Sequence, residues 1–243
     1  MKCYYDFHIH TALSPCGDDD MTPNNIVNMA VLKGLDAIAI TDHNTAKNVP
    51  ACVECAKDKP LVVIPGMEIE TAEEIHMLAL FDNTDALMRL DKIVSENLPD
   101  IKNREDIFGE QIIYDSNDNP IGREENMLVT ATALDIAAAA GIVRRLGGVA
   151  IPAHIDKSSY SIVSNLGFIP DEQEFSAVEV KDPLKIDKLS ESNKLDKYLI
   201  IHNSDAHYLW DIHEKEFFVN VDNISGLDII NKLRCGLSKN IVQ

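Results

Sequence analysis

The sequence predicts one α/β domain in which mostly parallel strands form a barrel or a doubly wound sheet. About seven or eight apolar segments of strand length alternate with helical segments, which is the order that β-α-β units produce. The chain has 243 residues, of which 45% are hydrophobic, and this is enough for one sizeable core. Histidines and carboxylates follow several of the strand-like segments, where active sites lie in parallel α/β folds.

The first expected strand covers residues 2–11 and carries two histidines near its end, His8 and His10. Side chains two positions apart on a strand point to the same face, so both imidazoles should project together. Thr22 and Pro23 then form a typical N-cap and first position of a helix.

The other elements are predicted by the same rules. Strands are expected where apolar runs end at turn residues or charges, namely at residues 35–41, 61–68, 74–81, 147–154, 175–180, 198–202 and 217–221. Helices are expected at residues 23–33, 46–57, 84–94, 131–146 and 226–235. The first two strands and the helix between them form a β-α-β unit, whose crossover should be right-handed.

Residues 99–129 form the one irregular stretch of the expected single domain, residues 1–243. Strand-like segments at residues 112–115 and 120–123 flank the turn-forming residues 116–119, which predicts a hairpin insertion. Such an insertion commonly shapes a substrate mouth, and a surface hairpin without such a role is the alternative.

Composition narrows the function classes. No apolar run approaches the roughly 18 residues of a membrane span, and the N-terminus does not look like a signal peptide, so we expect a cytoplasmic protein that does not bind membranes. Five widely spaced cysteines do not suggest a disulfide framework.

The net charge of −18 opposes binding of a long polyphosphate, so we do not expect an extended nucleic acid as partner. A small anionic substrate remains compatible, because bound cations reverse the field inside a site. The oligomeric state stays open.

Most of the histidines share a position relative to the expected strands. Six of the eight lie in or just beyond a strand, and two carboxylates, Glu68 and Asp205, accompany them. The six are His8, His10, His43, His76, His154 and His207. Imidazoles and carboxylates suit zinc, manganese or iron, and this set is too large for one ion. The sequence therefore predicts two or three divalent metal ions that share a bridging carboxylate.

These residues fall in motifs that resemble a known family. The motifs are His8-Ile9-His10-Thr11, Thr41-Asp42-His43, Pro65-Gly66-Met67-Glu68, His76, Pro152-Ala153-His154 and Ser204-Asp205-Ala206-His207. In order and spacing they resemble the polymerase and histidinol phosphatase (PHP) family, over residues 1 to about 221. The resemblance implies a distorted (β/α)7 TIM-like barrel, a di- or trinuclear metal centre and hydrolysis of phosphoesters.

The resemblance also implies a distribution of ligands over three ions. The first ion would be held by His8, His10, Glu68 and Asp205, and the second by Glu68, His76 and His154. His43 and His207 would hold the third with a loop residue. The loop departs from the family pattern, because Pro15-Cys16-Gly17 follows Ser14. If residues 15–17 are an insertion, Asp18 takes the ligand position. Cys16 is the alternative for zinc, and an acidic loop that only caps the next helix is another.

The expected chemistry is metal-assisted hydrolysis. Two close metal ions lower the pKa of a bridging water and clamp the oxygens of the phosphate. Glu68 would bridge the ions, and Asp205 or His207 could move protons. Lys157 and Lys181 follow strand ends, where they would reach a bound phosphate.

We therefore expect a metal-dependent phosphoesterase that hydrolyses a small phosphorylated metabolite or nucleotide by attack of a metal-bridged hydroxide. An exonuclease or nucleotide phosphodiesterase of the same fold is the alternative. A hydrolase of carbon-nitrogen bonds and a metal-binding regulatory module without turnover are weaker alternatives.

Overall fold

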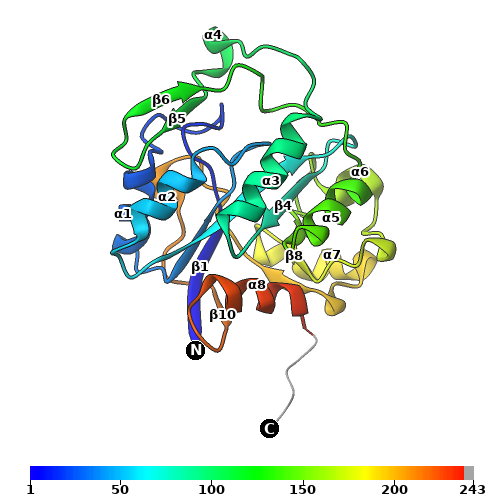
Figure 1. The fold of residues 1–243 in the computed structure, drawn as a ribbon. Helices are drawn as coiled ribbons and strands as arrows, with labels where there is room; N and C mark the ends of the chain where they lie inside the picture. Colours follow the sequence, from blue (N-terminus) through cyan, green and yellow to red (C-terminus); the bar gives the residue numbers. More distant parts are fainter. Residues whose placement is uncertain (238–243) are drawn as a thin grey trace.

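The computed structural model describes residues 1–237 and has a mixed α/β fold around a curled six-stranded sheet (Figure 1). The strand order is β10-β1-β2-β3-β4-β7. The bounds are β1 (Lys2–Ile9), β2 (Ala37–Ile40), β3 (Val62–Glu70), β4 (His76–Leu80), β7 (Val149–Pro152) and β10 (Phe218–Asn220). These strands lie where the sequence predicted them.

Strand direction changes along this sheet. β1, β2 and β3 are parallel, whereas β4 is antiparallel to both β3 and β7, and β10 is antiparallel to β1. The connection between β3 and β4 is a short turn in which Thr71 N donates to the Ile75 carbonyl, at 2.9 Å. A parallel connection needs a dozen or more residues, so this turn can only form a hairpin.

A second sheet pairs β8 (Ala177–Glu179) with β9 (Leu199–Ile201) in parallel. Backbone hydrogen bonds join it to the main sheet on both sides. Ile155 N, after β7, donates to the Glu179 carbonyl at 2.9 Å, and His10 N donates to the Ala206 carbonyl at 3.0 Å. The α/β class is therefore confirmed, while the count of seven β/α units stays a prediction.

Five helices correspond to expected ones: α1 (Pro23–Leu32), α2 (Val49–Ala56), α3 (Thr84–Ser95), α5 (Ile136–Arg145) and α8 (Gly226–Cys235). Helix α5 begins later than residue 131, because the Asp135 side chain caps it by accepting from Ala138 N. Three short helices were not predicted, namely α4 (Glu105–Phe108), α6 (Ile162–Leu166) and α7 (Ile186–Asn193). None of the described helices is long and apolar enough to cross a membrane.

The predicted hairpin is present as β5 (Ile112–Tyr114) and β6 (Pro120–Arg123), which pair antiparallel beyond the sheet (Figure 1). Asn48, before α2, fixes it: its Oδ1 accepts from Tyr114 N at 2.8 Å, and its Nδ2 donates to the Ile112 carbonyl at 3.1 Å. The same Nδ2 lies 2.9 Å from Thr11 Oγ1, so the insertion is tied to the loop that follows β1.

A register shift in β1 decides which way its histidines point. Phe7 packs in an apolar cluster with Leu78, Ile151 and Ile201, whereas Ile9 packs in the other apolar cluster. The pairing of β1 with β2 shifts between Asp6 and Ile9. Because Ile9 faces away from the cluster that holds Phe7, its neighbours His8 and His10 face toward that side. The two imidazoles therefore lie at the end of an apolar interior.

Candidate metal centre

The ends of the strands bring the candidate ligands into one buried cluster. His8 comes from β1, Glu68 from β3 and His76 from the start of β4. The others follow the ends of strands: His10, His43, His154, Asp205 and His207. Most of these residues are buried, while the side chains of His76 and His207 keep 12% and 24% of their surface exposed.

Glu68 lies at the centre of this cluster. Nitrogen atoms of five imidazoles lie 3.1–3.4 Å from its two oxygens, and they belong to His8, His10, His43, His76 and His154. In the described part of the chain, three groups of donors have ligand atoms within 4.8 Å of one another. They are His8, His10 and Glu68; His43, Glu68 and His76; and His10, His43 and His207. Glu68 belongs to two of these groups, as a bridging ligand would.

Asp205 joins the cluster to two lysines. Its Oδ1 lies 3.4 Å from Nε2 of His8 and of His10. Its Oδ2 lies 2.5 Å from Lys157 Nζ and 3.4 Å from Lys181 Nζ. The side chains of the two lysines are 38% and 42% exposed, so their charges border both the cluster and solvent. Lys157 and Lys181 therefore lie where an anion at the cluster would meet them.

Unpaired donor atoms show that the cluster suits divalent cations. Among the described residues, the buried cluster atoms His43 Nδ1 and Glu68 Oε2 have no hydrogen-bond partner, although they lie 3.1 Å apart. In addition, Nε2 of His8 and Nε2 of His10 lie 3.1 Å apart. At this distance they form a hydrogen bond only if one of the two nitrogens carries a proton, because otherwise two lone pairs face each other. Leaving a buried polar atom unpaired costs about 1–3 kcal/mol, which a bound cation would remove.

The pKa shifts express the same need for positive charge. Burial would raise the pKa of Glu68, but His76 and His8 outweigh it and hold that pKa well below its ordinary value. The pKa of Asp205 is also far below its ordinary value, because His8 outweighs the effect of burial. Burial would lower the pKa of His8, yet Glu179 and Glu68 raise it well above its ordinary value. The pKa of His76 is raised as well, because Glu68 outweighs burial, whereas burial lowers the pKa of His10 to about 4 and that of His43 well below its ordinary value. Positive charge on His8 and His76 thus takes the electrostatic role of the cations.

Glu179, at the end of β8, orients two candidate ligands and was not predicted. Its Oε1 lies 3.0 Å from His8 Nδ1 and accepts from Asn203 Nδ2 at 2.7 Å, while its Oε2 accepts from His154 N at 2.7 Å. Burial opposes its ionisation, but His8 outweighs burial and lowers the pKa of Glu179. This contact directs the Nε2 lone pair of His8 into the cluster. The sequence signal that could have revealed it is a carboxylate inside the apolar segment at residues 175–180, because a buried carboxylate needs polar partners.

A second set of supporting residues holds His10. Its Nδ1 lies 3.1 Å from Ser14 Oγ, and Ser14 Oγ donates to Asp42 Oδ1 at 2.7 Å. Asp42 also accepts from Thr11 N at 2.7 Å and Thr11 Oγ1 at 2.8 Å. Burial outweighs these hydrogen bonds and raises the pKa of Asp42 to about 6. Because Ser14 uses its proton toward Asp42, His10 donates from Nδ1 and leaves Nε2 free for an ion.

The loop ligand of the third predicted ion is not placed by this geometry. Asp18 belongs to none of the three donor groups in the described residues, and its Oδ1 accepts from Asp20 N at 3.0 Å. Its backbone N nevertheless donates to the His207 carbonyl at 2.9 Å. The alternative, Cys16, is exposed as a residue, while partial burial of its thiol and the charge of Glu68 raise the pKa to about 12. Asp18 as a ligand stays a prediction.

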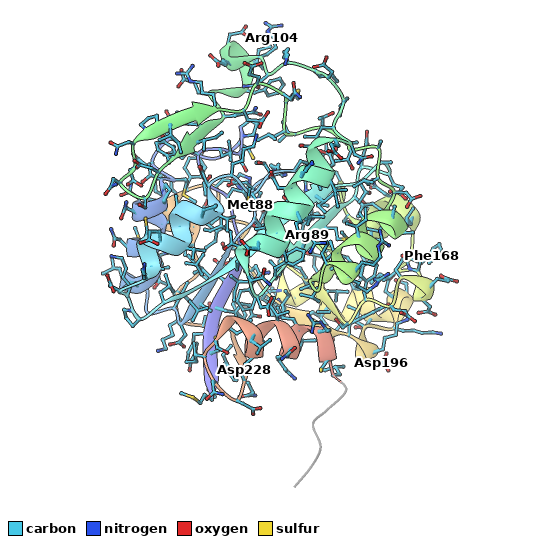
Figure 2. The ribbon with its side chains drawn as sticks, in the orientation of Figure 1. Met88, Arg89, Arg104, Phe168, Asp196 and Asp228 are labelled. Carbon is cyan, nitrogen blue, oxygen red and sulfur yellow. The ribbon has the colours of Figure 1, made fainter. Side chains whose placement is uncertain are left out.

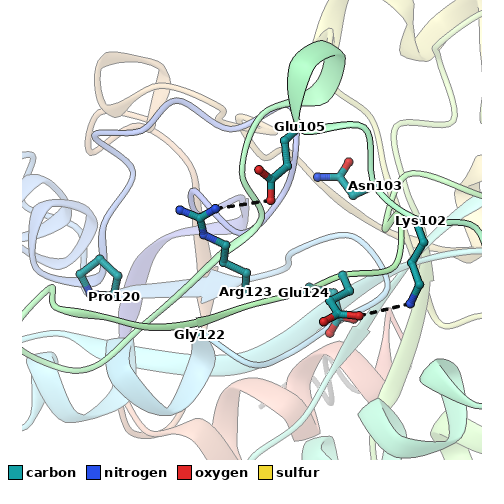
Figure 3. A pocket seen from close by; sticks show the side chains of 8 residues that line it. Lys102, Asn103, Glu105, Pro120, Gly122, Arg123 and Glu124 are labelled. Carbon is teal, nitrogen blue, oxygen red and sulfur yellow. Dashed lines mark hydrogen bonds and ion pairs between the residues drawn. The ribbon is translucent and has the colours of Figure 1, made fainter.

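A hollow of about 700 Å³ lies on the insertion rather than at the donor cluster (Figure 3). It is lined by Lys102, Asn103, Glu105, Pro120, Gly122, Arg123, Glu124 and Glu125. Its charges form ion pairs, with 3.4 Å between Arg123 and Glu105 and 3.3 Å between Lys102 and Glu125. None of these eight residues belongs to the predicted site.

Comparison with known proteins gives a family and several relatives. The PHP domain family matches residues 6–156. An uncharacterized protein of Methanocaldococcus jannaschii is 36% identical over 88 residues, which are 33% of this chain and 51% of the relative. A 5′-3′ exoribonuclease of Haemophilus influenzae is 27% identical over 189 residues, covering 62% of this chain and 68% of that enzyme. The chain thus spans only about half the length of the archaeal relative.

The fold is also similar to solved structures. The lesion-specific endonuclease Q of Pyrococcus furiosus superposes with a TM-score of 0.69 at 17% identity, over 96% of this chain and 56% of that one. An endonuclease Q complex with a 27-mer duplex that carries an abasic lesion at the active site gives a TM-score of 0.66 at 16% identity, over 96% and 57% of the two chains. At these identities the likeness concerns the fold alone.

These relatives correct one prediction. The expectation of a small anionic substrate, with no extended nucleic acid as partner, is wrong, because the relatives include exoribonucleases and an endonuclease solved with a DNA duplex. The net charge of −18 is a property of the whole surface. The field at the donor cluster is local, and the charges of Lys157 and Lys181 beside Asp205 contribute to it.

Proposed function

The chain belongs to the PHP domain family and is a metal-dependent hydrolase, and on that premise we propose that it cleaves phosphodiester bonds from the 5′ end of single-stranded nucleic acid. The observation that carries the proposal is the convergence of five imidazoles on Glu68, next to an aspartate paired with two lysines. The alignment with a 5′-3′ exoribonuclease over 62% of the chain supports the substrate class and the direction.

The donor set suits two or three divalent cations, for which zinc, manganese and iron are candidates. His8, His10, Glu68 and Asp205 would hold one ion, and Glu68, His76 and His154 a second. His43 and His207 would hold a third, with Asp18 or Cys16 from the loop. When bound, such cations lower the pKa of water and neutralise charge on an attacked phosphate. We take strands β1, β2, β3, β4, β7, β8 and β9 as a distorted seven-stranded barrel in a single domain, with β10 at its edge.

The lysines and Asp205 would act on the substrate directly. Lys157 Nζ and Lys181 Nζ both lie near Asp205 Oδ2 and are partly exposed, so they can turn toward phosphate oxygens. Asp205 Oδ2 is then available as a proton acceptor. His207 lies with its ring 4.4 Å from that of His10, and its Nδ1 is 2.9 Å from the Asp205 carbonyl. Donation from Nδ1 would leave Nε2 of this partly exposed imidazole to bind an ion or move a proton.

An end-directed activity reconciles this site with the acidic surface. A net charge of −18 disfavours a long track of phosphate contacts. The 5′ end of a single strand needs only a few contacts near the scissile bond. Lys157 and Lys181 at Asp205, and Lys185 at 3.3 Å from Asp156, offer positive charge on that side.

The test is the order of products from a single-stranded oligoribonucleotide labelled at its 3′ end. With manganese added, we expect a ladder that shortens one nucleotide at a time from the 5′ end, and no cleavage with a chelator. Glu68→Gln is the control for contaminating nucleases. If manganese is bound and the oligoribonucleotide stays intact, or is cut only internally, the proposal is wrong.

A further inference from the structure

Tyr160 lies against the donor cluster and keeps much of its ring open to solvent. Its ring centroid is 4.9 Å from that of His76, with an angle of 30° between the planes, and its carbonyl accepts from His76 N at 3.0 Å. Even so, 46% of its surface is exposed. Since one face rests on His76, the remaining ring surface is available to another flat group.

The backbone at Tyr160 is held in an unfavourable conformation. Its φ is 54°, in the left-handed region that a bulky side chain rarely adopts. His154, in the same loop, also has a positive φ, of 29°. Such conformations are unfavourable and persist where surrounding structure imposes them, often at functional sites.

The loop after β7 fixes three different groups relative to one another. His154 Nε2 lies 3.2 Å from Glu68 Oε1, and Lys157 Nζ lies 2.5 Å from Asp205 Oδ2. A turn in which Lys157 N donates to the His154 carbonyl at 2.9 Å joins these two residues. Ser161 caps α6 and donates from Oγ to the Lys157 carbonyl at 2.8 Å. One short loop therefore presents a candidate ligand, a cation and, at Tyr160, an aromatic ring.

We propose that Tyr160 is a nucleobase seat, on which the base next to the scissile phosphate stacks. This inference rests on the proposed function and adds the residue that recognises the base. A single imidazole, His76, separates the ring from Glu68, because His76 Nδ1 lies 3.1 Å from Glu68 Oε1. One nucleotide would then contact both places, with its phosphate at the donor cluster and its base on Tyr160. Stacking accepts any base, since every base has an aromatic face.

The experiment compares two oligoribonucleotides that differ only at the 5′-terminal residue, which carries a base in one and none in the other. Tyr160→Leu should raise KM about tenfold for the complete substrate and leave KM for the abasic one unchanged, with kcat and bound manganese constant. Tyr160→Phe keeps the ring and should stay within about twofold of the wild type. Phe168→Leu is the matched control, because Phe168 is 57% exposed on the outer side of the molecule beside α6 (Figure 2).

The inference is overturned if Tyr160→Leu changes KM equally for both substrates, or changes neither. An equal change with loss of manganese would mean that Tyr160 only positions His76. If Tyr160→Leu does not fold, the wild type decides: it should show a KM about tenfold higher for the abasic substrate, and equal values contradict the seat. If manganese binds and neither oligoribonucleotide is cleaved, the proposed function fails. Binding of the two by wild type and variant, measured by fluorescence anisotropy, then tests the seat alone.

Discussion

The donor cluster and the hollow on the insertion both contain charged side chains, but these side chains are buried in the cluster and exposed in the hollow. In the hollow, Arg123 and Glu105 are each about half exposed, and Lys102 and Glu125 are exposed further. In the cluster, the side chain of Glu68 is 1% exposed and meets five imidazoles. Solvent screens the first set, whose ion pairs contribute about 0–1 kcal/mol each. Solvent does not screen the buried charges, so they need compensation from neighbouring groups, which bound cations would provide.

The largest expected effect tests this difference by neutralising one carboxylate in each region. Glu68→Gln should release two ions and lower turnover by more than about a thousandfold, because the central ligand loses its charge. Glu105→Gln, in the hollow, should leave both unchanged. Metal analysis after dialysis, together with kcat on an oligoribonucleotide, gives the answer. Full metal content in Glu68→Gln would show that the assignment of the bridge is wrong.

A smaller effect is expected from the supporting residue Glu179. Glu179→Gln keeps the shape of the side chain but removes the charge next to His8 Nδ1, so the affinity for manganese should fall about 10–100-fold. Titration of the metal-free protein by calorimetry measures this change. The control is Glu191→Gln on the exposed surface of α7. Equal affinities in wild type and Glu179→Gln would leave Glu179 as a packing residue only.

The pH dependence sharpens the same point. Burial would lower the pKa of His8, but Glu179 and Glu68 raise it well above its ordinary value, which favours the protonated imidazole in the metal-free protein. A cation needs the neutral imidazole and must displace that proton. Apparent affinity should therefore fall as the pH is lowered from 8 to 6, by up to about tenfold per pH unit. Calorimetry in two buffers of different ionisation enthalpy measures the proton release. Constant affinity without proton release contradicts the expectation.

The smallest effect concerns Lys157, which we assign to the substrate. Lys157→Ala should raise KM for an oligoribonucleotide about tenfold and leave the metal content unchanged, because one phosphate contact is lost. Initial rates over a range of substrate concentrations measure it. Lys188→Ala, an exposed lysine of α7, is the control. An unchanged KM would mean that Lys157 only pairs with Asp205 and does not contact the substrate.

The sequence predicted the elements well because hydrophobic periodicity and turn residues are local signals. It predicted the shared face of His8 and His10 for the same reason. It could not show the register shift in β1. This shift turns the imidazoles of His8 and His10 toward the side of the apolar cluster that contains Phe7. It also missed Glu179, because its partner His8 is 171 positions away in the chain and only the fold joins them.

Two other features depend on local backbone geometry. The Oδ1 of Asp18 accepts from Asp20 N, and Tyr160 combines an exposed ring with a positive φ. Neither leaves a trace in composition or spacing. The prediction about nucleic acid was wrong for another reason, since net charge averages over a surface while substrate contacts are local.

The most direct test of the central claim is the number of manganese ions that the metal-free chain binds, measured by equilibrium dialysis. We predict at least two ions per chain in the wild type and a loss of two in Glu68→Gln. A wild-type protein that binds none, or whose bound ions are indifferent to Glu68→Gln, would contradict the account.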